Sequence, residues 1–253
     1  ASAVSYLYYA DRIYQINLAI AGIAIGTVIL PNLSKYINSN NLDKINLIQN
    51  KALELSLFLS LPATFALIIA AEEITSALFG YGSFDLESIK NSSQALFYFA
   101  LGLPAFSLIK IFSSFLFARN NTKTPFHFSI IAVILNILIS IIFFKKLGFI
   151  IIPIATTISS WFNSFLLYLY LSKKSYFNFN KDQLLPILKI IISVFITNLI
   201  FYFLINIFSS YLEYGNQYKL LTIIILVIFT FLTYLSISIM TKAFKISDIK
   251  LKY

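Results

Sequence analysis

Residues 219–241 read KLLTIIILVIFTFLTYLSISIMT. After Lys219 this run carries no charged residue, and its apolar side chains do not follow the strict alternation of a half-buried strand. A helix needs about 20 mostly apolar residues to cross the hydrocarbon core of a bilayer. The run is therefore predicted to be a transmembrane α-helix.

Six further runs of this kind precede it, at residues 10–36, 49–71, 92–118, 125–144, 149–172 and 184–209. The chain is 59% hydrophobic and 11% charged, whereas a soluble domain has roughly 25% charged residues. Too much apolar surface is present for a water-soluble fold of this length. We expect an all-α, polytopic membrane helix bundle with seven transmembrane helices, the first of which ends near Pro31.

The charged residues lie mainly in the connections between these runs. Lysine and arginine gather in residues 37–48, 119–124 and 173–183 and in the C-terminal tail, whereas the connection 72–91 is acidic. Positively charged connections remain in the cytoplasm. We therefore expect the chain to enter the membrane from outside and to end in the cytoplasm. The net charge of +9 then reflects topology, and no nucleic-acid partner is expected.

Several classes of chemistry have no support in the sequence. There is no cysteine and only one histidine, so neither a disulfide nor a histidine- or thiolate-based metal site is expected. No P-loop, G-x-S-x-G or H-E-x-x-H motif occurs. We expect a protein that is not an enzyme and has no cofactor. The sequence begins without methionine, and we expect it to be part of a larger protein.

Arg12 stands out in the first run. It is one of only two arginines in a chain that otherwise uses lysine, and a guanidinium at the mouth of a membrane span is costly and usually functional. On a helix it shares a face with Gln15, Ala19, Gly22 and Gly26. This face suits a cavity or a bundle interior. The alternatives are that Arg12 only pairs with Asp11 and that the two glycines only pack against another helix.

Lys110 lies near the middle of the run 92–118, on one helix face with Ser107 and Ser114. A lysine at this depth does not easily extend to the interface. We interpret it as a lysine that lines a cavity, with a snorkelling or paired lysine as the alternative.

Weaker candidates are the polar residues of adjacent spans. Asn136, Ser140 and Thr156 are interpreted either as a small cation site or as interhelical hydrogen bonds. Lys51 and Glu54 are expected to form a solvated pair at the interface.

Four ordered motifs now indicate a family. They are YADRIYQ at residues 9–15, GIAIGTVILPNLSK at 22–35, LFGYGSF at 78–84 and FARNNTKTP at 117–125. Together they resemble the MurJ (MviN) family of lipid II flippases, within the MOP exporter superfamily. Asn17 stands where that family usually has proline, Ala19 where it often has glycine, and Asn120-Asn121 where it has Gln-Asp.

The resemblance implies a fourteen-helix flippase of the bacterial inner membrane, of which this chain is the C-terminal half. Such a protein moves undecaprenyl-pyrophosphate-linked peptidoglycan precursor, lipid II, from the inner to the outer leaflet by alternating access, and so serves cell-wall biogenesis and cell shape. The implied partners are lipid II, membrane lipids and the N-terminal half of the same protein. The substrate-binding candidates are Arg12, Lys110, Asp11 and Gln15. Because no P-loop occurs, we expect transport to respond to membrane voltage or to a monovalent cation gradient and not to ATP.

The chain is expected to divide into a transport lobe of five helices, residues 1–172, and two further helices, residues 173–253. The latter would form a groove for the lipid tail, followed by a short basic cytoplasmic tail. Three alternatives remain open: a related multidrug or O-antigen lipid exporter, a membrane-embedded glycosyl- or phosphotransferase that uses acids of the connection 72–91, and a structural subunit without transport.

Overall fold

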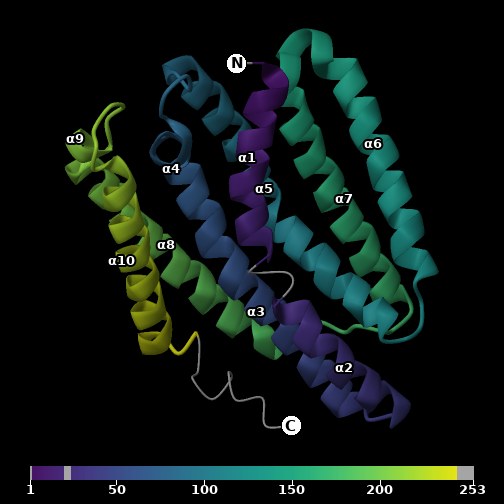
Figure 1. Ribbon diagram of the computed structural model, residues 1–253. Helices are drawn as coiled ribbons and strands as arrows, with labels where there is room; N and C mark the ends of the chain where they lie inside the picture. Colours follow the sequence, from purple (N-terminus) through teal and green to yellow (C-terminus); the bar gives the residue numbers. More distant parts are fainter. Residues whose placement is uncertain (1, 20–23, 244–253) are drawn as a thin grey trace.

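The computed structural model describes residues 2–19 and 24–243, and within these ranges the chain consists of helices joined by short connections, without strands (Figure 1). The longer helices are α1 (Ala3–Leu18), α2 (Ala24–Asn38), α3 (Leu42–Ile69), α5 (Leu86–Phe117), α6 (Lys123–Leu147), α7 (Ile151–Lys173), α8 (Leu184–Ile207) and α10 (Lys219–Met240). The shorter ones are α4 (Ala71–Phe79), α9 (Ser209–Leu212) and two 3-10 turns, η2 (Gly148–Ile150) and η3 (Lys181–Gln183). The predicted all-α bundle is confirmed.

Five stretches of the described residues are long and apolar enough to cross a membrane: Leu42–Ile69, Leu86–Phe117, Lys123–Lys173, Lys181–Ile207 and Lys219–Met240. The third contains two helices, α6 and α7, which lie side by side and antiparallel (Figure 1). Six of the seven predicted spans are therefore present as helices. The first predicted span, 10–36, corresponds to α1 and α2, of 16 and 15 residues. Residues 20–23 lie outside the described residues, so one continuous helix there stays a prediction.

Pro31 does not end the first run, because α2 continues through it to Asn38. A proline in a helix interior removes one backbone hydrogen bond, to the carbonyl four residues earlier. The Ser34 hydroxyl donates to the Leu30 carbonyl over 2.9 Å, which is a different carbonyl. Pro62 and Pro104 likewise lie within α3 and α5.

The connections alternate between the two ends of the bundle. The start of α1, helices α4 and α9, and the turn between α6 and α7 lie at one end, here called the α4 end (Figure 1). The α2–α3 turn, the turn after α5, and the segment between α7 and α8 lie at the other, here called the α2 end (Figure 1). The basic connections 37–48, 119–124 and 173–183 thus lie at the α2 end and the acidic connection at the α4 end, with Lys145 and Lys146 before the α6–α7 turn as an exception.

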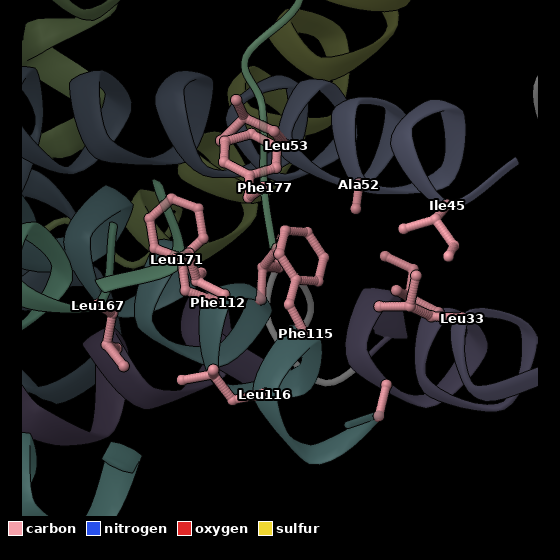
Figure 2. Close-up of a cluster of buried hydrophobic side chains, with 13 residues drawn as sticks. Leu33, Ile45, Ala52, Leu53, Phe112, Phe115, Leu116, Leu167, Leu171 and Phe177 are labelled. Atoms are coloured by element: carbon pink, nitrogen blue, oxygen red, sulfur yellow. The ribbon is translucent and has the colours of Figure 1, made fainter. Parts of the chain in front are cut away.

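The largest buried cluster holds the α2 end together. It joins α2, α3, α5 and α7, and Phe177 from the segment 174–180 packs against Phe112 and Phe115 within it (Figure 2). Phe177 is 1% exposed. The connection between α7 and α8 is therefore part of the core and is not a loose linker.

The outer surface is apolar, as expected for a chain that lipid surrounds. In α6 only Pro125 and Ala132 are buried, and most of its isoleucines and phenylalanines are exposed. Helices α8 and α10 pack against each other, and α8 also packs along α3. The predicted boundary at residue 172 and the lipid-tail groove stay predictions.

Candidate substrate-binding surface

The orientation of α1 is fixed by one closely packed face. Ala10, Ile13 and Tyr14 are buried against α5. The ring of Tyr14 stacks on Phe99 with 5.5 Å between centroids and meets Phe106 edge-on at the same distance. Side chains on the other side of α1 must therefore point away from α5.

Arg12 lies on this other side and is exposed. Its guanidinium lies over the ring of Tyr8, 4.7 Å from the centroid and one turn earlier in the helix. A cation over an aromatic face is attracted by the ring quadrupole. The contact stabilises the side chain and leaves its hydrogen-bond donors available.

Asp11 does not form an ion pair with Arg12 among the described residues. Instead, the side-chain amide of Gln15 donates a hydrogen bond to the Asp11 carboxylate, one turn away on the helix. Adjacent helical residues point in directions about 100° apart, whereas residues four apart are neighbours. The alternative that Arg12 merely pairs with Asp11 is therefore not what the structure contains. Asp11, Gln15 and Arg12 together form a polar surface on α1.

The glycines of the predicted α1 face are only partly placed. Gly22 lies outside the described residues, whereas Gly26 is in the first turn of α2. Whether they continue the surface of Arg12 stays a prediction.

Lys110 is half-buried on α5, one turn beyond Phe106. Within the described residues no carboxylate pairs with its ammonium group, so the paired alternative has no support. Ser107, on the same face, is fully buried and its hydroxyl has no hydrogen-bond partner, and the Ser114 hydroxyl donates to the Lys110 carbonyl over 2.9 Å.

Arg12 and Lys110 lie at different depths of the bundle. Helices α1 and α5 run in the same direction (Figure 1), and Tyr14 contacts both Phe99 and Phe106. With a rise of 1.5 Å per residue, Arg12 lies about 3 Å before Tyr14, and Lys110 about 6 Å beyond Phe106. The two cations are thus arranged in succession along the bundle.

The cation-site candidates are joined by hydrogen bonds between α6 and α7. The amide nitrogen of Asn136 donates to the Thr156 hydroxyl over 3.0 Å and to Ser159 over 3.4 Å. The Thr156 hydroxyl in turn donates to the Ile152 carbonyl. This arrangement fits interhelical hydrogen bonding, whereas a hard cation requires oxygen ligands. The Ser140 hydroxyl is buried without a partner, and a cation site here stays a prediction.

Lys51 and Glu54 form the expected ion pair, with 2.7 Å between nitrogen and oxygen. The pair is not solvated as predicted, because the Glu54 side chain is only 8% exposed. Helix α3 begins at Leu42, earlier than expected, and this places the pair within the packed bundle.

Two basic residues hold the molecule together in a way that the sequence interpretation missed. Arg119 donates to the carbonyls of Phe115 and Tyr176, over 2.8 and 2.9 Å, and lies over the Tyr176 ring. Burial lowers the pKa of its guanidinium, and the neighbouring Tyr176 acts in the opposite direction. The rarity of arginine in this chain was the signal that could have singled out Arg119. An arginine is used where its planar fork can bind two acceptors at once.

The second is Lys219, the first residue of the predicted span 219–241. It is 1% exposed. Its ammonium group donates to the Gly80 carbonyl and lies over the rings of Tyr81 and Tyr214, at 4.2 and 5.0 Å. No pattern near residue 219 predicts its partners.

Comparison with known proteins decides the family. The sequence profile described as Lipid II flippase MurJ matches residues 1–223. The chain belongs to the MurJ family. The expected resemblance is confirmed, and a family of flippases agrees with the expectation of a protein that is not an enzyme.

Named MurJ relatives support this membership. A probable lipid II flippase MurJ of Rickettsia prowazekii is 37% identical over 215 residues, which are 83% of this chain and 42% of the relative. The corresponding protein of Rhizobium meliloti is 42% identical over 166 residues, 66% of this chain and 31% of the relative. The chain therefore spans less than half the length of these MurJ relatives.

A solved structure has the same fold. It is a lipid II flippase MurJ in an inward closed conformation, with 28% identity and a TM-score of 0.74 over 95% of this chain and 47% of that one.

Proposed function

We propose that this chain is the C-terminal half of a lipid II flippase and that Arg12 binds the pyrophosphate of the lipid-linked precursor. The observation that carries the proposal is the exposed guanidinium of Arg12, on a helix of a membrane bundle and without an acidic partner among the described residues. A guanidinium binds phosphate oxygens through two parallel hydrogen bonds. Asp11 and Gln15 position the polar surface around it.

Lys110 is the second cation of this proposal. Because it lies further along the bundle from the α4 end than Arg12 of α1 does, it would contact the head group at another stage of the passage through the bundle. A half-buried ammonium group without a carboxylate partner is suited to a transient anionic ligand.

The rest of the proposal concerns the whole protein. The N-terminal half would supply the other side of the cavity and cover the exposed face of α1. The α2 end, where the basic connections gather, would face the cytoplasm of the bacterial inner membrane, together with the C-terminus. Helices α8 and α10 would bind the lipid tail, and a monovalent cation gradient would drive the cycle.

The test uses the full-length protein in cells that depend on it. Precursor exposed on the outer face is measured for wild type, Arg12→Lys and Arg12→Ala. Loss of a bidentate, charge-assisted contact should lower export about tenfold or more in both variants. Lys90→Ala is the matched control, because Lys90 is an exposed cation of α5. Wild-type export in both Arg12 variants would overturn the proposal.

The same experiment separates the alternatives. Membrane levels of each variant are measured in parallel, because a structural subunit would lose function only when it fails to insert. The mass of the exported precursor distinguishes a carrier from a transferase, since a carrier leaves its substrate chemically unchanged. Export of an unrelated amphiphile with equal sensitivity to Arg12→Lys would favour a drug exporter.

A further inference from the structure

A cavity of about 290 Å³ lies at the α4 end, between α4, the first turn of α5 and the segment that follows α9. Helix α4 contributes Glu72, Glu73 and Ser76 to its wall, and the segment after α9 contributes Glu213 and Tyr214. None of these residues belongs to the proposed substrate surface on α1.

The polar groups of this cavity lack partners of opposite charge. Among the described residues, no ion pair involves any of its three carboxylates. The hydroxyl of Ser76, a residue that is 5% exposed, has no hydrogen-bond partner. Burial raises the pKa of the Glu73 carboxyl, and the charge of Glu72 raises it further. A buried polar group without a partner is costly, so the wall is suited to a ligand that donates hydrogen bonds.

The geometry favours an organic cation over a metal ion. Within the part of the chain that the structure describes, no three acidic or histidine side chains are close enough to hold a metal. Carboxylates only accept hydrogen bonds, whereas a primary ammonium group donates three. Lys219, the nearby cation, is already engaged by the Gly80 carbonyl and by two tyrosine rings.

The position of the cavity indicates where such a cation comes from. Phe208, Tyr211, Tyr214 and Tyr218 are all exposed in the connection between α8 and α10. Exposed aromatic side chains of this kind mark the level of the lipid head groups. The cavity is also lined by Leu86, which is 60% exposed, so a lipid can approach along an apolar surface.

We propose that this cavity binds the ammonium group of an aminophospholipid, with phosphatidylethanolamine as the fitting head group. Glu73 and Glu213 accept hydrogen bonds from the ammonium group, and Ser76 accepts a third. The site is independent of the proposed transport function, because it uses neither Arg12 nor Lys110.

The test measures lipid adducts on the full-length protein by native mass spectrometry. The probes are detergent micelles doped with phosphatidylethanolamine, phosphatidylcholine or phosphatidylglycerol. Only the first has N–H donors on a cation, so it should bind most tightly. Glu73→Gln and Glu213→Gln should each weaken its binding about tenfold, which is typical of a lost charge-assisted hydrogen bond. Ser76→Ala should weaken it less.

Glu87→Gln is the matched control, because Glu87 is an exposed carboxylate in the first turn of α5 that does not line the cavity. It should leave binding unchanged. Glu213 is exposed, so its variant tests the site even if Glu73→Gln folds poorly. Equal binding of phosphatidylethanolamine and phosphatidylcholine, or equal loss in Glu87→Gln and Glu213→Gln, would overturn the proposal. Displacement of the lipid by purified lipid II, with the same dependence on Glu213, would assign the site to an amine of the substrate instead.

Discussion

The ammonium group of Lys219 donates a hydrogen bond to the backbone carbonyl of Gly80, although the two residues are 139 positions apart in the sequence. Gly80 follows the last residue of α4, where carbonyl groups lack helical partners and the helix dipole favours a cation. Lys219 is the first residue of α10. This contact therefore joins the last transmembrane helix to the short helix at the α4 end.

Lys219→Met should destabilise the full-length protein by about 1–3 kcal/mol, because the Gly80 carbonyl would remain buried without its donor. Thermal unfolding in detergent measures this effect. The exposed Lys90 provides the control variant Lys90→Met, which should unfold like wild type. If the two variants unfold at the same temperature, the contact does not stabilise the fold.

Gly80→Ala should also destabilise the protein, for a steric reason. An added Cβ would lie 2.6 Å from the Ser76 carbonyl oxygen and 2.9 Å from the Ile89 side chain. Backbone atoms cannot move away cheaply, so α4 would shift from α10. Gly82→Ala is not a suitable control, because the φ of Gly82 is +61° and a side chain there would be strained for that reason alone. Ala77→Gly in α4 measures the effect of helix propensity separately.

The packing of the segment 174–180 should depend on two hydrogen-bond donors that share one carbonyl acceptor. Arg119 and Gln49 both donate to the Tyr176 carbonyl over 2.9 Å. We therefore expect non-additive losses in a double-mutant cycle of Arg119→Lys and Gln49→Ala, with a coupling energy of about 0.5–3 kcal/mol. Unfolding temperature and protease cleavage within the segment are the measurements. Strict additivity would show that the two donors act separately.

The hydrogen bond from Asn136 to Thr156 should contribute modestly to the pairing of α6 and α7. Hydrogen bonds between transmembrane helices average about 0.6 kcal/mol and reach about 1.7. Asn136→Ala should lower stability within this range, in sodium and in choline buffers alike. A loss seen only in sodium would instead support the cation site.

Glu73 should make stability depend on pH in an unusual direction. Burial raises the pKa of its carboxyl in the folded protein, so the folded state binds a proton more tightly than the unfolded state does. Its contribution to stability is then greatest below the unfolded pKa and decreases as pH rises from the unfolded value through the folded value. Glu73→Gln should remove this decrease, whereas Glu87→Gln should leave it unchanged. Thermal unfolding between about pH 4 and pH 8 provides the comparison.

Much of the architecture follows from local sequence patterns. Long apolar runs allow only membrane-spanning helices, since the backbone must satisfy its own hydrogen bonds in lipid. For this reason six spans could be located, four of them within a few residues of their observed ends, whereas α3 and α5 begin six or seven residues earlier than expected. The motifs around Arg12 and Arg119 indicated the family, whereas the membrane orientation inferred from the charge of the connections stays a prediction. These features depend only on neighbouring residues.

Partners far apart in the sequence could not be predicted in this way. A hydropathy pattern places Lys219 at the start of a span, but only packing of α10 against α4 places its ammonium group beside Gly80. Packing also decided the burial of Glu54, since the sequence predicted its ion pair with Lys51 but not its low exposure. Sequence determined which segments enter the membrane, because insertion depends on local hydrophobicity. Tertiary structure decided which polar groups meet, because that depends on how separate helices pack and rotate against one another.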